Sequence, residues 1–425
     1  MSQKIVFLHP LFLILSANNA NGQRAHAINF YPTIDKLHVI MKHKAPLIIA
    51  ACSILFVVTL SSLWIWSLGV KTEIAGFSNT AAAITANYQR KTFYANGYHW
   101  IFYSNGTHIL YTNSRDGSNW NPPAVVRTGI SSSGMSIWYD GNMSVSYAYA
   151  SGIPGDPVVY RAGLVTNDEI RWGPEQTVSA GKNDHEYYNG FCTIDSLGNH
   201  WVSYIDDYNG NRSSYAVKAA SKDGATWSDP VRIAEPIYMA TYWRTSLLPL
   251  NNGEVYAILA SQIRVKGRLW NGNAWQEEET ITTKGLQQDF GYSAISDNGD
   301  VHLVLLESQT YNILYFKRTS GQGWENSVSV QENQDASSLP ILTMDKSTHR
   351  LYCFWVYNNI IYMKRTVNAS WENQASTSFG TSFDTLRVIS SFYYVWDGKI
   401  GVARLERPDP KVESFILKYD YVEVS

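Results

Sequence analysis

The sequence predicts an all-β fold, a β-propeller with seven blades, and three observations support that prediction. Tryptophans recur every 47 to 55 residues within residues 87–425. Seven segments of the same stretch place a tight turn before an apolar strand. No window shows the apolar period of a helix. Repeats of about 50 residues with four short strands each are typical of propeller blades. A six-bladed ring with an irregular end is the alternative.

The tight turns mark the same point of each repeat. Asn-Gly and Asp-Gly pairs favour hairpins because a type I′ turn needs positive φ at both central residues. The seven turns are Asn96-Gly97, Asp140-Gly141, Gly198-Asn199, Asn252-Gly253, Asn298-Gly299, His349-Arg350 and Asp397-Gly398. Each repeat therefore predicts a strand, a tight turn, a second strand, a loop, a third strand, a tryptophan turn and a fourth strand.

The last repeat ends at residues 419–424 without a tryptophan turn, so it lacks one strand. We expect residues 81–88, just before the first repeat, to supply that strand. Closing the ring with a strand from the other end of the repeats leaves few free sheet edges.

The residues before the repeats divide into three segments. Residues 1–44 are predicted to be a cytoplasmic tail or leader, and residues 69–86 a linker. Between them, residues 45–68 carry no charge and span about 36 Å as a helix, enough to cross a bilayer. Basic residues 42–44 favour a transmembrane signal anchor with the repeats outside the cytoplasm. A cleaved signal peptide starting at Met41, which releases a secreted protein, is the alternative.

Composition narrows the choice of partners. The net charge of −2 gives no basic field that would attract nucleic acid. Aromatic residues make up 14% of the chain, a share that favours β-strands and partly solvated surfaces. Cys192 and Cys353 are the two cysteines within the repeats, too few for a disulfide scaffold. We expect two buried thiols rather than a bridge.

Three tryptophan turns share one spacing, in which an aspartate precedes the tryptophan by four residues. A short carboxylate at that position can accept backbone N–H groups of the turn. The tryptophan can then pack between neighbouring blades. The pairs are Asp116 and Trp120, Asp168 and Trp172, and Asp223 and Trp227.

This spacing, in phase with the repeat, resembles the Asp-box (BNR) repeat of sialidase-like propellers over about residues 87–425. The resemblance implies that these turns are structural and lie on the face opposite the functional one. It therefore implies no catalytic role for the three aspartates.

The opposite face is predicted to carry any chemistry. Loops that lead into the innermost strands converge on the central axis, so side chains far apart in sequence can meet there. The candidates for catalysis are His185, Glu186, Tyr242 and Arg244. The candidates for ligand binding are Arg90, Asp184, Tyr187, Trp243, Asp289, Asp384 and Arg387. The loops between second and third strands add Asp156, Asp206, Asp207 and Arg264.

Two enzyme classes fit parts of this set. A sialidase-like glycosidase would hold a substrate carboxylate between Arg90, Arg244 and Arg387, although the Arg-Ile-Pro motif of that family is absent. A lyase of anionic polysaccharides would use His185 and Tyr242 as base and acid. In that class Arg244 would hold the uronate, and Asp206-Asp207 replaces a second expected histidine.

The interpretation that we favour is a membrane-anchored propeller that binds glycans or a protein partner without catalysis. Tyr187, Tyr188, Tyr208, Tyr242 and Trp243 would offer stacking surfaces. No cofactor is predicted, because no His/Cys set has zinc spacing and no glycine-rich phosphate loop is present. Residues 206–211 carry oxygen ligands suited to Ca²⁺ but not the spacing of an EF-hand loop.

Overall fold

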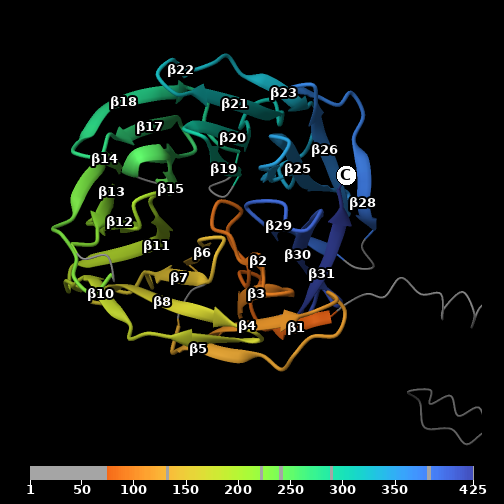
Figure 1. Cartoon of the computed structure of the whole chain (residues 1–425), viewed down its shortest axis with the longest axis horizontal. Coiled ribbons are helices and arrows are strands. Elements are labelled where there is room, and N and C mark those ends of the chain that lie inside the picture. Colours follow the sequence, from red (N-terminus) through yellow and green to blue (C-terminus); the bar gives the residue numbers. More distant parts are fainter. Residues whose placement is uncertain are drawn as a thin grey trace, which may run out of the picture. The chain divides into compact units, whose positions relative to one another are not determined.

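The structure, a computed structural model, describes residues 74–130, 134–220, 224–238, 243–287, 291–380 and 384–424. Of residues 238, 377–380 and 384–387 the structure describes the backbone. Within the unit Lys71–Ser425, the described chain forms seven antiparallel sheets around a central axis (Figure 1). This confirms the predicted all-β, seven-bladed propeller and rules out the six-bladed alternative.

Each of the first four blades is a sheet whose strands follow chain order from the axis outward. Blade 1 contains β2 (Thr92–Ala95), β3 (Tyr98–Ser104), β4 (His108–Ser114) and β5 (Ala124–Thr128). Blade 2 contains β6 (Met135–Tyr139), β7 (Ser144–Tyr149), β8 (Val158–Thr166), β9 (Glu169–Trp172) and β10 (Gln176–Ser179). Blade 3 contains β11 (His185–Ile194), β12 (His200–Tyr208), β13 (Asn211–Lys218) and β14 (Val231–Tyr238). Blade 4 contains β15 (Arg244–Pro249), β16 (Val255–Ala260), β17 (Val265–Trp270) and β18 (Trp275–Thr282), with a 3-10 turn η1 (Asn251–Gly253).

The last three blades complete the ring. Blade 5 contains β19 (Tyr292–Asp297), β20 (Asp300–Leu306), β21 (Ile313–Thr319), β22 (Gly323–Trp324) and β23 (Val328–Gln331). Blade 6 contains β24 (Ile341–Asp345), β25 (Arg350–Tyr357), β26 (Ile360–Val367), β27 (Ser370–Trp371) and β28 (Ser376–Gly380). Blade 7 contains β29 (Asp384–Ser391), β30 (Lys399–Arg407), β31 (Phe415–Glu423) and β1 (Ile74–Ser78).

The strand that closes the ring is β1, which pairs with β31 at the outer edge of blade 7. The prediction that residues 81–88 supply this strand is wrong, and part of the predicted linker is this strand. Residues 81–88 instead turn inward, and Ala83, Ile84 and Tyr88 are buried. Ala83 and Ile84 pack in the core between blades 7 and 1, and Tyr88 packs against blades 3 to 5.

Residues 86–91, here called the axial plug, cross the centre of the ring before β2 begins. Tyr88 stacks on Tyr292 with ring centroids 5.0 Å apart. The polar side chains of the axial plug bond to five other blades or their connections. Asn87 donates to the carbonyls of Leu339 and Pro340, Gln89 to that of Gly190, Arg90 to Ser293 and Ser391, and Lys91 to the carbonyl of Met135. The axial plug therefore ties the innermost strands together.

In blades 1 to 6 a tryptophan packs against the blade before it, as the repeat predicts. Each indole meets an aromatic ring of the preceding blade edge-on, with centroids 5.1 to 6.2 Å apart. Such pairs add stabilisation beyond the apolar area that they bury. The pairs are Trp120 with Tyr419, Trp172 with Phe102, Trp227 with Tyr160, Trp275 with Trp201, Trp324 with Tyr256, and Trp371 with Tyr315.

Two other predictions concern the cysteines and the N-terminal anchor. Cys192 and Cys353 are both free and buried, as predicted. In the part of the chain that the structure describes, no helix is long and apolar enough to cross a membrane. The predicted tail and anchor, residues 1–68, lie outside the described residues.

Candidate functional site

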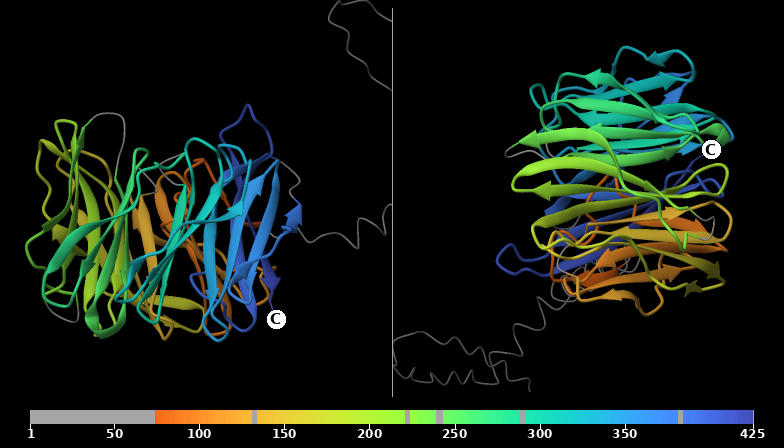
Figure 2. Two further views of the ribbon diagram at one scale, coloured as in Figure 1. Left: turned by 90° about the horizontal axis from the view of Figure 1, so that it is seen from above. Right: turned by 90° about the vertical axis from the view of Figure 1, so that its left-hand side faces the viewer.

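The strands run between two faces of the ring, which Figure 2 shows edge-on. We call the face with the first-to-second and third-to-fourth strand turns the turn face. The loop face carries the connections into each innermost strand and the second-to-third strand connections. His185, Arg244 and Arg264 all lie at strand ends on the loop face, because β11 and β15 begin there and β17 follows Arg264.

A histidine–aspartate pair stands at the start of blade 3. His185 opens β11 opposite Tyr208, the last residue of β12. Its Nδ1 lies 2.7 Å from Asp206 Oδ1, and its ring stacks on Tyr208 with centroids 4.7 Å apart. Tyr208 is 43% exposed. The pair therefore fixes the imidazole beneath an aromatic ring that faces solvent.

The neighbouring residues of β11 point in alternate directions, as a strand requires. The Tyr188 hydroxyl donates to Glu186 Oε2. Tyr187 is buried against Tyr204 of blade 3, and burial raises the pKa of its hydroxyl. Asp184 is mostly exposed, with Oδ1 3.8 Å from His185 Nε2. Of the predicted set, Asp184, His185 and Glu186 thus share one strand start, while Tyr187 belongs to the core.

The start of blade 4 holds two arginines around one buried indole. Trp243 is 1% exposed and its Nε1 donates to the Glu235 carbonyl of blade 3. Arg244 is 5% exposed and bonds to the Trp243 carbonyl. Arg264 lies over the Trp243 ring, 5.7 Å from its centroid. Trp243 therefore supports an arginine from below and does not present its own face to a ligand.

Arg264 has no anionic partner among the described residues. Its Nε is buried without a hydrogen-bond partner there. The indole and a turn hold the residue in place: the Ser261 hydroxyl donates to the Arg264 carbonyl and accepts the Arg264 backbone N–H. A cation held this way is suited to an anion that arrives from outside.

The structure moves Arg90 away from the predicted ligand-binding set. Arg90 is 1% exposed within the axial plug and lies over the Tyr393 ring, 4.8 Å from its centroid. Burial lowers the pKa of its guanidinium to about 10, partly offset by Tyr393 and Tyr394. Its hydrogen bonds to Ser293 and Ser391 give it a structural place between blades 5 and 7.

Four predicted residues lie outside the part of the chain whose side chains the structure describes. Tyr242 and Asp289 lie outside the described residues, and Asp384 and Arg387 are described only as members of β29. Their proposed roles therefore remain predictions.

The tryptophan turns on the turn face differ in detail. Asp116 Oδ1 accepts the backbone N–H groups of Ser118 and Asn119, which hold the pKa of its carboxyl well below the usual range. Asp168 instead sits in a two-residue hairpin after Asn167, whose φ is +42°. Asp223 lies outside the described residues.

In the described parts of the ring, no group of three or more His, Cys, Asp or Glu side chains is placed to hold a metal ion. A cavity of about 1010 Å³ lies on the turn face, lined by first-to-second strand turns of blades 2 to 7. The sequence did not indicate it as a site. The sequence feature that could have indicated this cavity is the aromatic segment Phe392-Tyr393-Tyr394-Val395-Trp396, which connects two strands of blade 7.

Comparisons with known proteins identify the class of fold. No protein-family model and no curated protein sequence matches the chain. Among solved structures, the chain is similar to an ulvan lyase of a new polysaccharide lyase family, solved bound to -[GlcA(1-4)Rha3S]-. That match has a TM-score of 0.59 and 10% identity, and covers 82% of this chain and 95% of the lyase.

Two further structures have related folds. Polysaccharide lyase Uly1 gives a TM-score of 0.51 at 9% identity over 79% of this chain and 90% of the lyase. A Penicillium chrysogenum alpha-L-arabinanase complexed with arabinobiose gives 0.46 at 13% identity, over 67% and 92%. The chain is a seven-bladed β-propeller, and the two polysaccharide lyases are similar to it in fold. At these identities the likeness concerns the fold.

Proposed function

We propose that this propeller binds an anionic glycan on the loop face of blades 3 and 4. The observation that carries the proposal is Arg264, a cation stacked on Trp243 with no anionic partner in the described chain. A guanidinium presents a planar fork of donors that matches a uronate carboxylate or a sulfate ester. An anionic sugar would supply the missing acceptors.

Tyr208 supports a sugar rather than a small anion. Its exposed ring rests on His185, whose orientation Asp206 fixes. Aromatic rings with one exposed face are suited to the apolar face of a pyranose, and nearby carboxylates such as Asp184 can accept sugar hydroxyls. The structural neighbours that act on polysaccharides agree with this class of ligand.

The test measures binding of purified full-length protein to uronate-bearing, sulfated and neutral polysaccharides. The charged polymers are expected to bind and the neutral one to bind weakly or not at all. Arg264→Met should weaken binding about 10- to 100-fold, since a hydrogen bond to a charged group contributes about 1.5–3 kcal/mol. Arg171→Met is the matched control, because Arg171 is an exposed arginine on the turn face. Equal binding by both variants would contradict the proposal.

A polysaccharide lyase is the second candidate, and the geometry of His185 favours it. Because the Asp206 carboxylate beside Nδ1 is an acceptor, the neutral ring that a general base requires would carry its proton on Nδ1 and leave the lone pair on Nε2. Nε2 would remove the proton at C5 of a uronate while a cationic side chain, Arg264 in this proposal, stabilises the carboxylate of the same sugar. The electron pair then forms the C4–C5 double bond and the C4–O bond breaks, with a proton delivered to the leaving oxygen. Tyr242 remains the predicted proton donor.

The two candidates separate in one measurement. A lyase releases an unsaturated uronyl product that absorbs ultraviolet light, and His185→Gln should abolish that product while leaving binding within about threefold. Binding with no unsaturated product from any uronate polymer excludes the lyase and keeps the binding proposal.

A further inference from the structure

The turn face holds a second candidate site, separate from the loop face. Its cavity of about 1010 Å³ surrounds the axis where the innermost strands end. The axial plug closes the channel on its inner side, since Arg90 packs on Tyr393 at the cavity wall. The cavity is therefore a blind pocket, open on the turn face.

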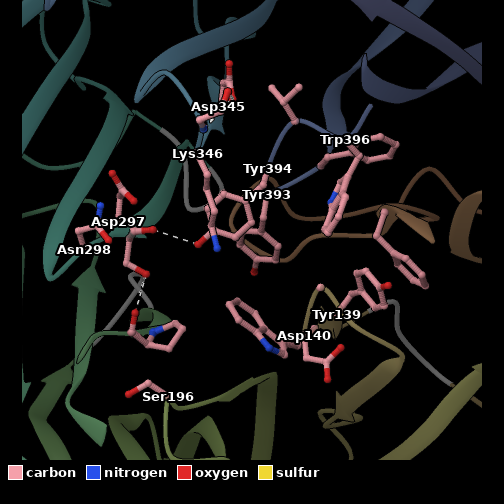
Figure 3. Close-up of a pocket in the computed structure, with 18 of the residues that line it drawn as sticks. Tyr139, Asp140, Ser196, Asp297, Asn298, Asp345, Lys346, Tyr393, Tyr394 and Trp396 are labelled. Carbon is pink, nitrogen blue, oxygen red and sulfur yellow. Dashed lines mark hydrogen bonds between the residues drawn. The ribbon is translucent and has the colours of Figure 1, made fainter. Parts of the chain in front are cut away.

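One connection distinguishes this pocket from the other turns of the ring. Residues 392–398, here called the aromatic arm, join β29 to β30 and reach across the axis. The backbone N–H of Val395 donates to Met344 O of blade 6 at 2.8 Å. The Tyr394 hydroxyl donates to Ser296 O of blade 5 at 3.0 Å, a bond drawn in Figure 3. The aromatic arm is thus held as a wall of the pocket.

Two rings of the aromatic arm already hold cations of the protein itself. The Arg90 guanidinium lies 4.8 Å from the Tyr393 centroid. The Lys346 ammonium lies 3.8 Å from the Tyr394 centroid. Attraction between a cation and an aromatic face strengthens where water is excluded. The pocket therefore provides the environment that a bound cation requires.

The last ring of the aromatic arm is Trp396, which is partly exposed. No lysine or arginine of the described chain stands over it. The Trp396 indole packs beside blade 2, and its ring centroid lies 6.2 Å from that of Tyr139. Figure 3 shows Trp396, Tyr139 and Asp140 on one side of the pocket and Lys346 with Asp297 and Asn298 on the other. This corner has an aromatic face but no cation.

Charge in the pocket favours a cation at that corner. Five aspartates and one lysine line the cavity: Asp140, Asp195, Asp297, Asp345, Asp397 and Lys346. Asp140 Oδ1 accepts two backbone N–H groups of its own turn, and its carboxylate makes no ion pair with a described residue. Asp397, next to Trp396, likewise makes none. The pocket therefore carries uncompensated negative charge beside an open aromatic ring.

A buried polar atom in the same pocket also lacks a partner. Tyr393 is 9% exposed, and its hydroxyl forms no hydrogen bond within the described residues. In Figure 3 the Tyr393 and Tyr394 rings stand at the centre of the pocket. The hydroxyl is shielded from solvent on the inner side of the pocket, where the Arg90 guanidinium lies over the same ring.

We propose that the turn-face pocket binds a basic peptide, with a lysine or arginine side chain placed over Trp396 beside Asp140 and Asp397. A long unbranched side chain ending in a cation fits a blind pocket with aromatic walls and a carboxylate rim. The site is independent of the loop face, which offers a cation to an anionic ligand. The same pocket repels uronates and sulfated sugars.

The experiment titrates the full-length protein with tetralysine and with side-chain-acetylated tetralysine, by calorimetry at about 0.15 M salt, where distant surface charges are screened. Tetralysine is expected to bind and the acetylated peptide to bind at least tenfold more weakly. Trp396→Leu should weaken binding about three- to thirtyfold, the range of one cation–aromatic contact. Asp140→Asn keeps the turn's acceptor and removes its charge, and should weaken binding similarly.

Asp409→Asn is the matched control, because Asp409 is an exposed loop-face aspartate that also accepts a backbone N–H. It should bind tetralysine as the wild type does. Three results would overturn the proposal: no binding of tetralysine, equal loss in the Asp140 and Asp409 variants, or preferred binding of a neutral oligosaccharide. The first two results do not bear on Arg264, and a neutral oligosaccharide that still binds the Arg264→Met variant as it binds the wild type is assigned to the turn face.

Discussion

Replacing Arg90 by methionine tests whether the axial plug is structural. The sequence predicts that Arg90 binds a ligand, whereas in the structure its side chain is 1% exposed and therefore closed to solvent. It donates to Ser293 Oγ at 2.8 Å and to Ser391 Oγ at 3.1 Å, and also to the Leu342 carbonyl. These acceptors belong to blades 5, 7 and 6. The substitution removes all three donors and keeps an apolar chain of similar length.

The expected loss follows from these contacts. A hydrogen bond from a charged donor contributes about 1.5–3 kcal/mol. Part of that is offset, because burial disfavours the charged guanidinium and lowers its pKa to about 10. Ser391 also keeps a bond to Thr343 Oγ1. We therefore expect a net loss of about 2–4 kcal/mol in the free energy of unfolding. With an unfolding entropy of about 2.1 cal/mol/K per residue, this lowers Tm by about 3–6 °C.

The assay is thermal and urea unfolding followed by circular dichroism, with glycan binding measured in parallel. Arg171→Met, at an exposed ion pair with Glu169, should shift Tm by less than about 1 °C. A normal Tm for Arg90→Met combined with lost glycan binding would refute the reasoning. That result would return Arg90 to the ligand-binding role predicted from the sequence.

Three further predictions concern closure, blade packing and pH. Removing residues 1–79 deletes β1 and exposes the β31 edge. This chain should melt several degrees lower and scatter more light than a chain that lacks only residues 1–70. Equal melting temperatures would contradict closure of the ring by β1. Trp324→Phe removes the hydrogen bond from Nε1 to Tyr256 Oη. It should lower the free energy of unfolding in urea by about 1–2 kcal/mol more than Trp371→Phe, because Trp371 Nε1 has no partner in the described chain. Equal losses in the two variants would contradict a stabilising role of the Trp324 bond. Burial, helped by Lys317, lowers the pKa of His302 to about 4, so the folded state favours the neutral ring. Stability should therefore fall as pH drops from about 6.5 to 4, and less in His302→Gln; a urea midpoint that does not change over that range in the wild type would refute this.

Local sequence signals predicted the blades because most blades form from strands that follow one another in the sequence. A hairpin turn such as Asn96-Gly97 or Asn298-Gly299 fixes strand pairing within a few residues, and both turns have the positive φ that the prediction requires. The closing strand depends instead on contacts between the two ends of the ring. Residues 74–78 and 81–88 are both short segments before the first repeat, and the sequence does not show which one pairs with β31.

The candidate site was predicted less completely for a related reason. Asp184, His185 and Glu186 were found because they open an innermost strand. A residue at such a position can point outward, as Asp184 does, or inward, as Arg90 and Trp243 do. Sequence position alone does not separate these cases. Arg264 gained its importance from Trp243 beneath it, a contact that the sequence does not reveal.

The axial plug changes how the two faces of the ring relate to each other. In an open ring, a ligand bound on one face could reach the other through the axis. Here Tyr88 stacks on Tyr292, and Arg90 packs on Tyr393 from the interior. A chain that threads the axis would have to displace these buried contacts. The loop face, with Arg264, and the turn face, with Asp140 and Trp396, are therefore expected to bind ligands of opposite charge without competition, and a loss of binding on one face should leave the other unchanged.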